Sequence, residues 1–599
     1  MKGLVWHNEA NGYYQYRNGY IFRPSYKFNG YENTTTESSR TSNNDYWWGL
    51  QSRLQYDAKI RNHSITVMAG HEASENGGEG LSGLRRNFIT NAVQELPGGD
   101  ALTATNSSSK SSSSRESWFG RLNYVYNDKY ILQFTMRADG SSNFGPENRW
   151  GYFPAFSAAW RVSQEKFLQH VEAITDLKLR VEYGASGNSA AVGYYAALYS
   201  VPTANGTGYL SANFSNPFLQ WENSITSNIG FDLRLFHNRV EVIGDFYIKK
   251  VTKLLTTNDF PFYSGGDMSY SSGYIRFPTS NVGAMDNHGF GLTINTVNIE
   301  KPFMWRTGLN ISVDRNKVSE LYNNTPINST YGTSSLISSS RVNESAALFT
   351  GYIADGIFQS IDEIKKHAIQ TSSGVRLVDP AQGTWVGDIK FRDVSGPDGK
   401  PDGKIDQNDR VVIGNPWPKV TFGFTNSFSY KNFDLSVLVI GVQGNDVYNY
   451  TRYRNENPRG TAVYSNYFKS VANFARPSSI DANDQGTTLT NPGYQIARIT
   501  TNTANGNDRA TQWYVEDGSY IRIKNVTLSY FLPTKWAAKV AMRNLKVSAG
   551  VQNLATFTKY KGYDPEIGMS PNYGSMTVGV DDGRYPSTRM YSFSLTADF

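Results

Sequence analysis

The chain has 599 residues, a net charge of +6 and no cysteine. Without cysteine it can form no disulfide, zinc ribbon or thiol nucleophile, and its basic residues do not gather beside aromatic ones as in a nucleic-acid-binding protein. No stretch approaches the ~18 consecutive apolar residues that a transmembrane helix needs, and the N-terminus lacks the apolar core of a secretory signal peptide. Aromatic residues make up 14% of the chain, with 39 Tyr and 32 Phe, which is typical of strand-rich proteins.

Apolar and polar residues alternate in segments along the chain, for example in residues 177–184, 420–430 and 545–552. Because successive side chains of a strand point to opposite faces, each such segment forms a strand with one apolar and one polar face. A soluble β-sandwich shows the same alternation, so the alternation does not tell whether the apolar faces meet membrane lipid or the core of a water-soluble protein. The connections between the strands distinguish these two cases.

The predicted connections fall into two kinds. The short ones are residues 127–128, 236–238, 300–301 and 431–432. The long ones are residues 74–116, 187–224, 251–283, 320–417, 444–518 and 557–584. The first of them overlaps the serine-rich run 106–117, which is predicted to be a loop. Outer-membrane barrels have short periplasmic turns and long extracellular loops. If the C-terminus is periplasmic, successive connections counted back from it lie on alternate sides of the membrane. Every long connection then lies on the extracellular side, and residues 533–544 lie on the periplasmic side.

This sorting predicts an all-β fold, an antiparallel transmembrane β-barrel with about sixteen strands in this chain. Residues 319–417 and 444–518 are expected to be its large extracellular loops. We expect the whole chain, 1–599, to belong to one such barrel in the outer membrane of the cell.

An acidic run within the first large loop is the best candidate for a metal site. Asp398, Asp402, Asp406 and Asp409 stand at positions 1, 5, 9 and 12 of an EF-hand-like loop, and Asp393 is near enough to supply a further oxygen. Hard oxygen ligands of this kind suit Ca²⁺, although Lys400 occupies position 3. The alternative is a Gly/Asp/Pro-rich turn stabilised by hydrogen bonds from Asp side chains.

Other residues gave weaker signals. Gly78, Gly80 and Gly83 match a dinucleotide fingerprint without the βαβ unit that it needs, and the seven His residues are scattered. No Ser, His and carboxylate trio stands out, so no catalytic residue and no enzyme activity is predicted. Aromatic residues of the predicted loops either stack on sugar rings or pack the loops themselves. These are Trp221, Trp513, Tyr514, Tyr560 and Tyr563.

The C-terminal segment alternates and ends on an aromatic residue. Tyr591, Phe593, Leu595 and Phe599 share one face of the expected strand. We interpret them as a signal for the barrel-assembly machinery of Gram-negative bacteria; an ordinary closing strand is the alternative.

Several stretches resemble the SusC/RagA-type TonB-linked outer-membrane proteins, in family order along nearly the whole chain. They are SWFGRLNY (117–124), RADGSSNFG (137–145), LKLRVEYG (177–184), GDIKFRD (387–393), DGKID (402–406) and KYKGYDPE (559–566). The resemblance implies the C-terminal part of a TonB-dependent transporter, about sixteen strands of a barrel that closes with ~22, with the N-terminal plug domain absent from this chain.

The resemblance also implies partners. A SusD-type surface lipoprotein would cover the outer loops, and the TonB–ExbB–ExbD complex would act through the N-terminal part. The cargo would be a glycan or peptide oligomer, and this chain alone would not transport it. A surface adhesin and a glycan-binding β protein are the alternative functions.

Overall fold

The computed structural model describes residues 3–28, 30–189, 198–203, 206–211, 215–257, 279–331, 335–457, 466–493, 496–539, 542–569 and 577–598. Sixteen strands form one sheet, as the sequence predicts. In sheet order they are β1 (Leu4–Arg23), β4 (Glu37–Ile60), β5 (His63–Arg86), β6 (Thr105–Tyr126), β7 (Tyr130–Ser141), β8 (Trp150–Arg161), β9 (Ile174–Asn188), β12 (Glu222–Leu235), β13 (Val240–Thr257), β14 (Thr279–Ile299), β15 (Phe303–Glu320), β22 (Val420–Tyr430), β23 (Phe433–Gln443), β26 (Tyr520–Phe531), β27 (Asn544–Thr558) and β29 (Met590–Asp598). No helix among these described residues is long and apolar enough to span a membrane.

The chain divides into two compact units. The first unit comprises Met1–Gln169, Lys178–Ile229 and Lys249–Gly283, and the second comprises His170–Leu177, Gly230–Ile248 and Ala284–Phe599.

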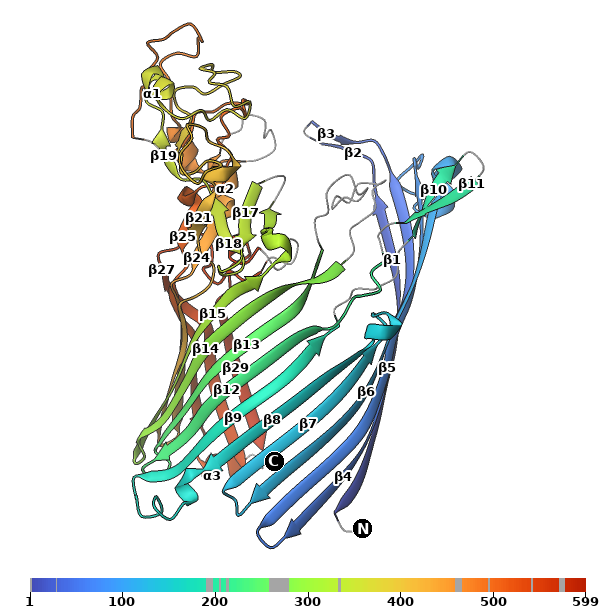
Figure 1. The fold of residues 1–599 in the computed structure, drawn as a ribbon, viewed down its shortest axis with the longest axis vertical. Coiled ribbons are helices and arrows are strands. Elements are labelled where there is room, and N and C mark those ends of the chain that lie inside the picture. Colours follow the sequence, from blue (N-terminus) through green and yellow to red (C-terminus); the bar gives the residue numbers. More distant parts are fainter. Residues whose placement is uncertain are drawn as a thin grey trace. The chain divides into compact units, whose positions relative to one another are not determined.

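Figure 1 shows the seven neighbouring strands of the first unit, from β1 to β9. A row of apolar side chains crosses these strands. Each member is paired with the next in the sheet register, and all are between 41% and 47% exposed to solvent. The row consists of Leu4, Tyr56, Val67, Leu122, Phe134, Phe156 and Tyr183. A continuous apolar row this exposed would be costly in water, whereas it suits a face in contact with hydrocarbon.

Aromatic residues border this apolar face toward both ends of the strands. Tyr126, Tyr130 and Trp160 are paired across β6, β7 and β8 near one end of the strands. Ten residues from Trp160, on the same face of β8, stands Trp150. That distance is ~33 Å along a strand, or ~25 Å across the membrane at a strand tilt of ~40°. The apolar face therefore has the height of the band found on outer-membrane barrels.

The opposite face of the same strands is polar and charged. Arg137 lies 3.1 Å from Glu72 and 2.6 Å from Asp139, and Arg53 and Arg121 occupy neighbouring positions of this face. The two faces of these strands thus differ as the wall of an aqueous channel requires.

The predicted loop at residues 74–116 is wrong over most of its length. β5 continues to Arg86 and β6 begins at Thr105, so the serine-rich run 106–117 is strand and only residues 87–104 connect the two. Its serines pair with the glycine-rich part of β5, for example Ser112 with Gly77. Backbone hydrogen bonds hold this pairing, and both faces there are polar, which removes the alternation on which the sequence prediction relied.

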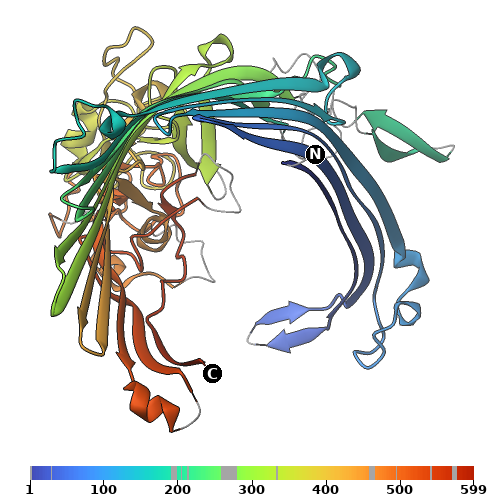
Figure 2. The ribbon, with the colours of Figure 1, turned by 90° about the horizontal axis from the view of Figure 1, so that it is seen from below.

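In the second unit the short and long connections lie at opposite ends of the strands. The turns 300–302 and 431–432 and the helix α3 (Thr534–Ala538) lie at one end (Figure 1), the end that faces the viewer in Figure 2. Residues 321–419, 444–519 and 559–589 connect the strands at the other end (Figure 1). This confirms the predicted sorting of these connections.

A lysine placed on the apolar face tests whether this face is in contact with lipid or with water. Phe134→Lys should lower the unfolding free energy in lipid vesicles by ~2–4 kcal/mol, because a cation near the middle of the bilayer is poorly solvated. Gln133→Lys, one residue away on the polar face, should change it little. Urea titration of both variants in vesicles makes the comparison, and equal losses would contradict the assignment of the faces.

Candidate functional site: the loop module

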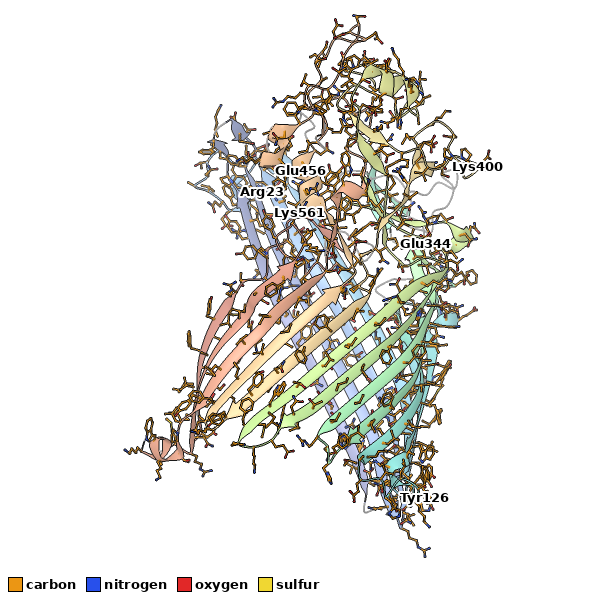
Figure 3. The ribbon with its side chains drawn as sticks, turned by 90° about the vertical axis from the view of Figure 1, so that its left-hand side faces the viewer. Arg23, Tyr126, Glu344, Lys400, Glu456 and Lys561 are labelled. Atoms are coloured by element: carbon orange, nitrogen blue, oxygen red, sulfur yellow. The ribbon has the colours of Figure 1, made fainter. Side chains whose placement is uncertain are left out.

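Three long connections of the second unit, residues 321–419, 444–519 and 559–589, fold together into one body over the part of them that the structure describes. We name this body the loop module. Figure 3 shows Glu344, Lys400, Glu456 and Lys561, one or two from each connection, beyond the same end of the strands. Its elements are β16 (Ile327–Tyr331), β17 (Ser335–Ser340), β18 (Leu348–Gly351), β19 (Ala354–Ile357), α1 (Ile361–Lys366), β20 (Ile389–Phe391), β21 (Val411–Gly414), β24 (Asp446–Asn449), α2 (Tyr450–Glu456), β25 (Val515–Asp517) and β28 (Val580–Asp581). β24 pairs with β25 of the same connection. It also pairs with β28, and this second pairing joins the second connection to the third.

The loop module has a hydrophobic core of its own. Three buried clusters surround Trp513, whose ring packs against all of them. Phe349 and Tyr448 belong to the first cluster, Trp385 to the second and Phe391 to the third, and each of these side chains is fully buried. Loops with such a core hold a fixed surface, in contrast to solvated excursions.

This core decides the role of most of the loop aromatics. Tyr514 and Tyr560 are each only 6% exposed, and Trp221 of the first unit packs against Phe144 and Phe153. These rings, like that of Trp513, take part in packing, and those of Tyr514 and Tyr560 are too buried to stack on a sugar. Tyr563 differs, with 66% of it exposed.

A buried ion pair ties the first connection to the second. Arg498 donates to both carboxylate oxygens of Asp388, at 2.7 and 3.2 Å, and Asp388 is completely buried. Asn507 Nδ2 and the backbone N–H of Trp385 donate to the same carboxylate, at 2.8 and 2.7 Å. All these donors are satisfied only when the two connections meet in one register, so the pair fixes how the module folds. Sequence reasoning missed it, because 110 residues separate the partners.

The third connection is tied to the sheet by a similar contact. Arg522 of β26 is 2% exposed and lies 2.5 Å from Asp564 and 2.6 Å from Glu566. Burial raises the pKa of Asp564, but hydrogen bonds from the backbone N–H groups of Glu566 and Ser587 and from Arg522 outweigh it and leave the pKa below its ordinary value. The carboxylate form is therefore favoured, and the contact persists at neutral pH.

A polar pocket of about 560 Å³ opens in the loop module beside Tyr352. The guanidinium groups of Arg410 and Arg509 lie 5.7 and 4.9 Å from its ring centre, and Arg410 Nε donates to its hydroxyl at 3.2 Å. Thr371 and Ser373 also line the pocket. The carboxylates of Asp406 and Asp508 line it as well, so the pocket offers both hydrogen-bond donors and acceptors to a polar ligand.

The predicted calcium residues lie in turns of the loop module and bond to backbone N–H groups. Asp393 accepts from Gly403 at 2.7 Å, Asp402 from Lys404 at 3.0 Å, and Asp406 from Asn408 at 2.7 Å. The buried Asp409 accepts from Val394, Ser395 and Asp406, and Asp398 is exposed. Across the described ranges no three His, Asp or Glu side chains gather closely enough to hold a metal ion. Calcium binding stays a prediction, and these hydrogen bonds support the alternative of a turn held by Asp side chains.

Of the predicted assembly signal, Tyr591, Phe593 and Leu595 stand on β29 with between 62% and 83% of each exposed. Phe599 lies outside the described residues. Recognition by the assembly machinery also stays a prediction.

Removing one partner of the buried ion pair tests its role. Arg498→Met leaves the Asp388 carboxylate buried and uncompensated, which should cost ~3–5 kcal/mol and make residues 444–519 sensitive to proteases at lower urea concentrations. Arg454→Met is the control, because its pair with Asp582 is exposed and pairs of that kind contribute little. Equal protease sensitivity of the two variants would show that the buried pair does not fix the module.

Titration calorimetry of the full chain with CaCl₂ tests the calcium hypothesis. An EF-hand-like site predicts saturable heat that Asp406→Asn removes, because the ion loses a carboxylate ligand. The absence of saturable heat in the unchanged chain would leave the turn as the explanation of the acidic run.

Comparison with known proteins adds the family. The sequence profile described as "TonB dependent receptor-like, beta-barrel" matches residues 2–402. TonB-dependent receptor P3 of Formosa agariphila is 32% identical over 565 residues, 92% of this chain and 52% of that protein. TonB-dependent receptor SusC of Bacteroides thetaiotaomicron is 27% identical over 542 residues, 87% of this chain and 48% of that protein. The chain therefore spans about half the length of the curated relatives it matches.

Among solved structures, that of the RagAB peptide transporter superposes with a TM-score of 0.76 at 21% identity, covering 100% of this chain and 60% of that one. At this identity the likeness shows a shared fold. With the apolar face, the sorted connections and the profile match, it leads to one conclusion: the chain belongs to the TonB-dependent receptor β-barrel family, in its SusC/RagA-type branch, and its place is the outer membrane.

Proposed function

We propose that this chain is the barrel part of a transporter that imports oligomeric nutrients, glycans or peptides, together with a SusD-type surface lipoprotein. The observation that carries the proposal is that one chain has both a polar sheet face, in the first unit, and a folded loop module, in the second. A polar face is what a channel wall needs, and a module with its own core is what a second protein needs in order to dock reproducibly.

The partner lipoprotein would dock on the loop module. Docking on solvated loops would require them to be ordered first, at a cost in conformational entropy. Here the Asp388–Arg498 pair and the core around Trp513 order the module beforehand. The names of two similar proteins, SusC and RagAB, motivate the choice of a SusD-type partner.

Energy would come from the TonB–ExbB–ExbD complex, acting on an N-terminal plug. The relatives' additional length, about half of each, leaves room for such a part. On this proposal the chain's own residues do no chemistry: they form the wall, the lining and the docking surface. Similar proteins carry receptor and transporter names.

The charges of the lining support the proposed cargo class. Arginine and carboxylate side chains alternate on the polar face of the first unit, as in the Glu72, Arg137 and Asp139 group. Charges of both signs can contact the backbone and ends of a peptide as well as a charged glycan. The RagAB structure is that of a peptide transporter, and we propose glycan or peptide oligomers as the cargo here.

Co-purification and uptake in the parent cell test the proposal. A tagged copy of the encoded protein should co-purify with a surface lipoprotein, and cells should take up labelled oligomers in a way that a protonophore abolishes. Arg498→Met should reduce lipoprotein recovery several-fold, whereas Arg454→Met should not, because only the former loosens the docking surface. Binding of oligomers to the cell surface without uptake would instead indicate an adhesin.

A further inference from the structure

An apolar groove of about 930 Å³ crosses the outer face of the first unit, over β1, β4, β5, β6, β7 and β8. Its floor consists of the small residues Ala69, Gly120 and Ala138. Large side chains form its walls, among them Trp6, Trp118 and Tyr152. We call it the outer groove. It is continuous with the apolar row through Leu4, which also lines it.

Gly120 at the floor has no structural reason to be glycine. A Cβ built there would meet only the backbone oxygen of Met68, at 3.6 Å, which is ordinary van der Waals contact, and its backbone is not in the left-handed region. The register of β6 with β5 and with β7 runs through Gly120 without a bulge. Glycine inside a strand weakens it, and where it marks no bulge or bend it marks the close approach of a ligand or of another backbone.

The other glycines of this region differ. A Cβ at Gly70 would lie 2.5 Å from the Phe119 ring, and one at Gly140 would lie 3.2 Å from the Trp150 ring. Those positions are small because protein side chains already cover them. At Gly120 the space stays open, so something outside this chain is expected to fill it.

The walls present mainly apolar surface to the groove. The indole N–H of Trp6 donates to Ser52 Oγ at 2.9 Å, and that of Trp118 to Glu116 Oε1 at 3.3 Å. Both rings therefore offer their faces without an unsatisfied donor. At the upper wall the His71 ring lies 4.3 Å from the Trp118 ring and its Nε2 lies 3.1 Å from Glu116, so the groove passes from apolar to polar at one edge.

We propose that the outer groove binds one acyl chain of an outer-membrane lipid, more tightly than the lipids that merely surround the barrel. The groove belongs to the face that the family assignment turns toward hydrocarbon. It lies within the apolar band, with Trp118 and Tyr152 of one register row among its walls, at the depth of acyl chains, and its polar edge lies toward the lipid head groups. The proposal concerns lipid alone and stands whether or not the chain transports oligomers.

Filling the floor tests the proposal. The full chain is purified from the outer membrane in detergent, washed by detergent exchange, and its retained lipid is counted by mass spectrometry. The unchanged chain should retain about one lipid per protein, and Gly120→Leu at least tenfold less. Ala138→Leu, a second position on the floor, should give the same loss. Ala158→Leu is the matched control, because Ala158 is on the same face of β8 outside the groove, and it should retain lipid like the unchanged chain.

Folding is a weak concern for these variants, because leucine fits a strand better than glycine does; circular dichroism checks it. No retained lipid on the unchanged chain, or equal retention by Gly120→Leu, would overturn the proposal. Light scattering gives a further decision: if Gly120→Leu turns a dimer into a monomer without changing lipid retention, the groove binds a second copy of the chain and the lipid assignment is wrong.

Discussion

Inside a bilayer every backbone N–H and C=O must find its partner within the protein, and this constraint shapes the whole chain. A sheet meets it only through continuous strand pairing, and the regular registers from β1 to β9 supply such pairing in the first unit. Once pairing is fixed, the two-residue period assigns each side chain to one of two solvents. The apolar row from Leu4 to Tyr183 and the charged groups around Arg137 follow from that division.

The same constraint does not apply to the connections between the strands. At the strand ends the chain leaves hydrocarbon, so length and composition there can vary, and in the second unit three connections have become a folded module. The module obeys the rules of a water-soluble protein: a core around Trp513, and a buried ion pair whose hydrogen bonds are satisfied only in one arrangement. The transport hypothesis needs both parts, a wall that stays fixed and a surface on which a partner can dock.

The sequence predicted what depends on local pattern. The strand number and the turns at 300–301 and 431–432 agree with the structure, because alternation and short polar turns are local signals. The sequence does not predict long-range contacts. Nothing in the sequence near Asp388 points to Arg498, and nothing near Gly120 shows that no side chain covers this glycine. Residues 106–117 were misassigned because a strand that leaves the membrane loses its alternation.

Labelling of single cysteines in intact cells tests the sorting of the connections most directly, since the natural chain has no cysteine of its own. Asn483→Cys lies in an exposed part of the loop module, and Glu300→Cys lies at the turn between β14 and β15. A maleimide that cannot cross the outer membrane should label Asn483→Cys at once and Glu300→Cys only after the cells are broken. Labelling of Glu300→Cys in intact cells, or of neither site, would contradict the arrangement of wall and loops described above.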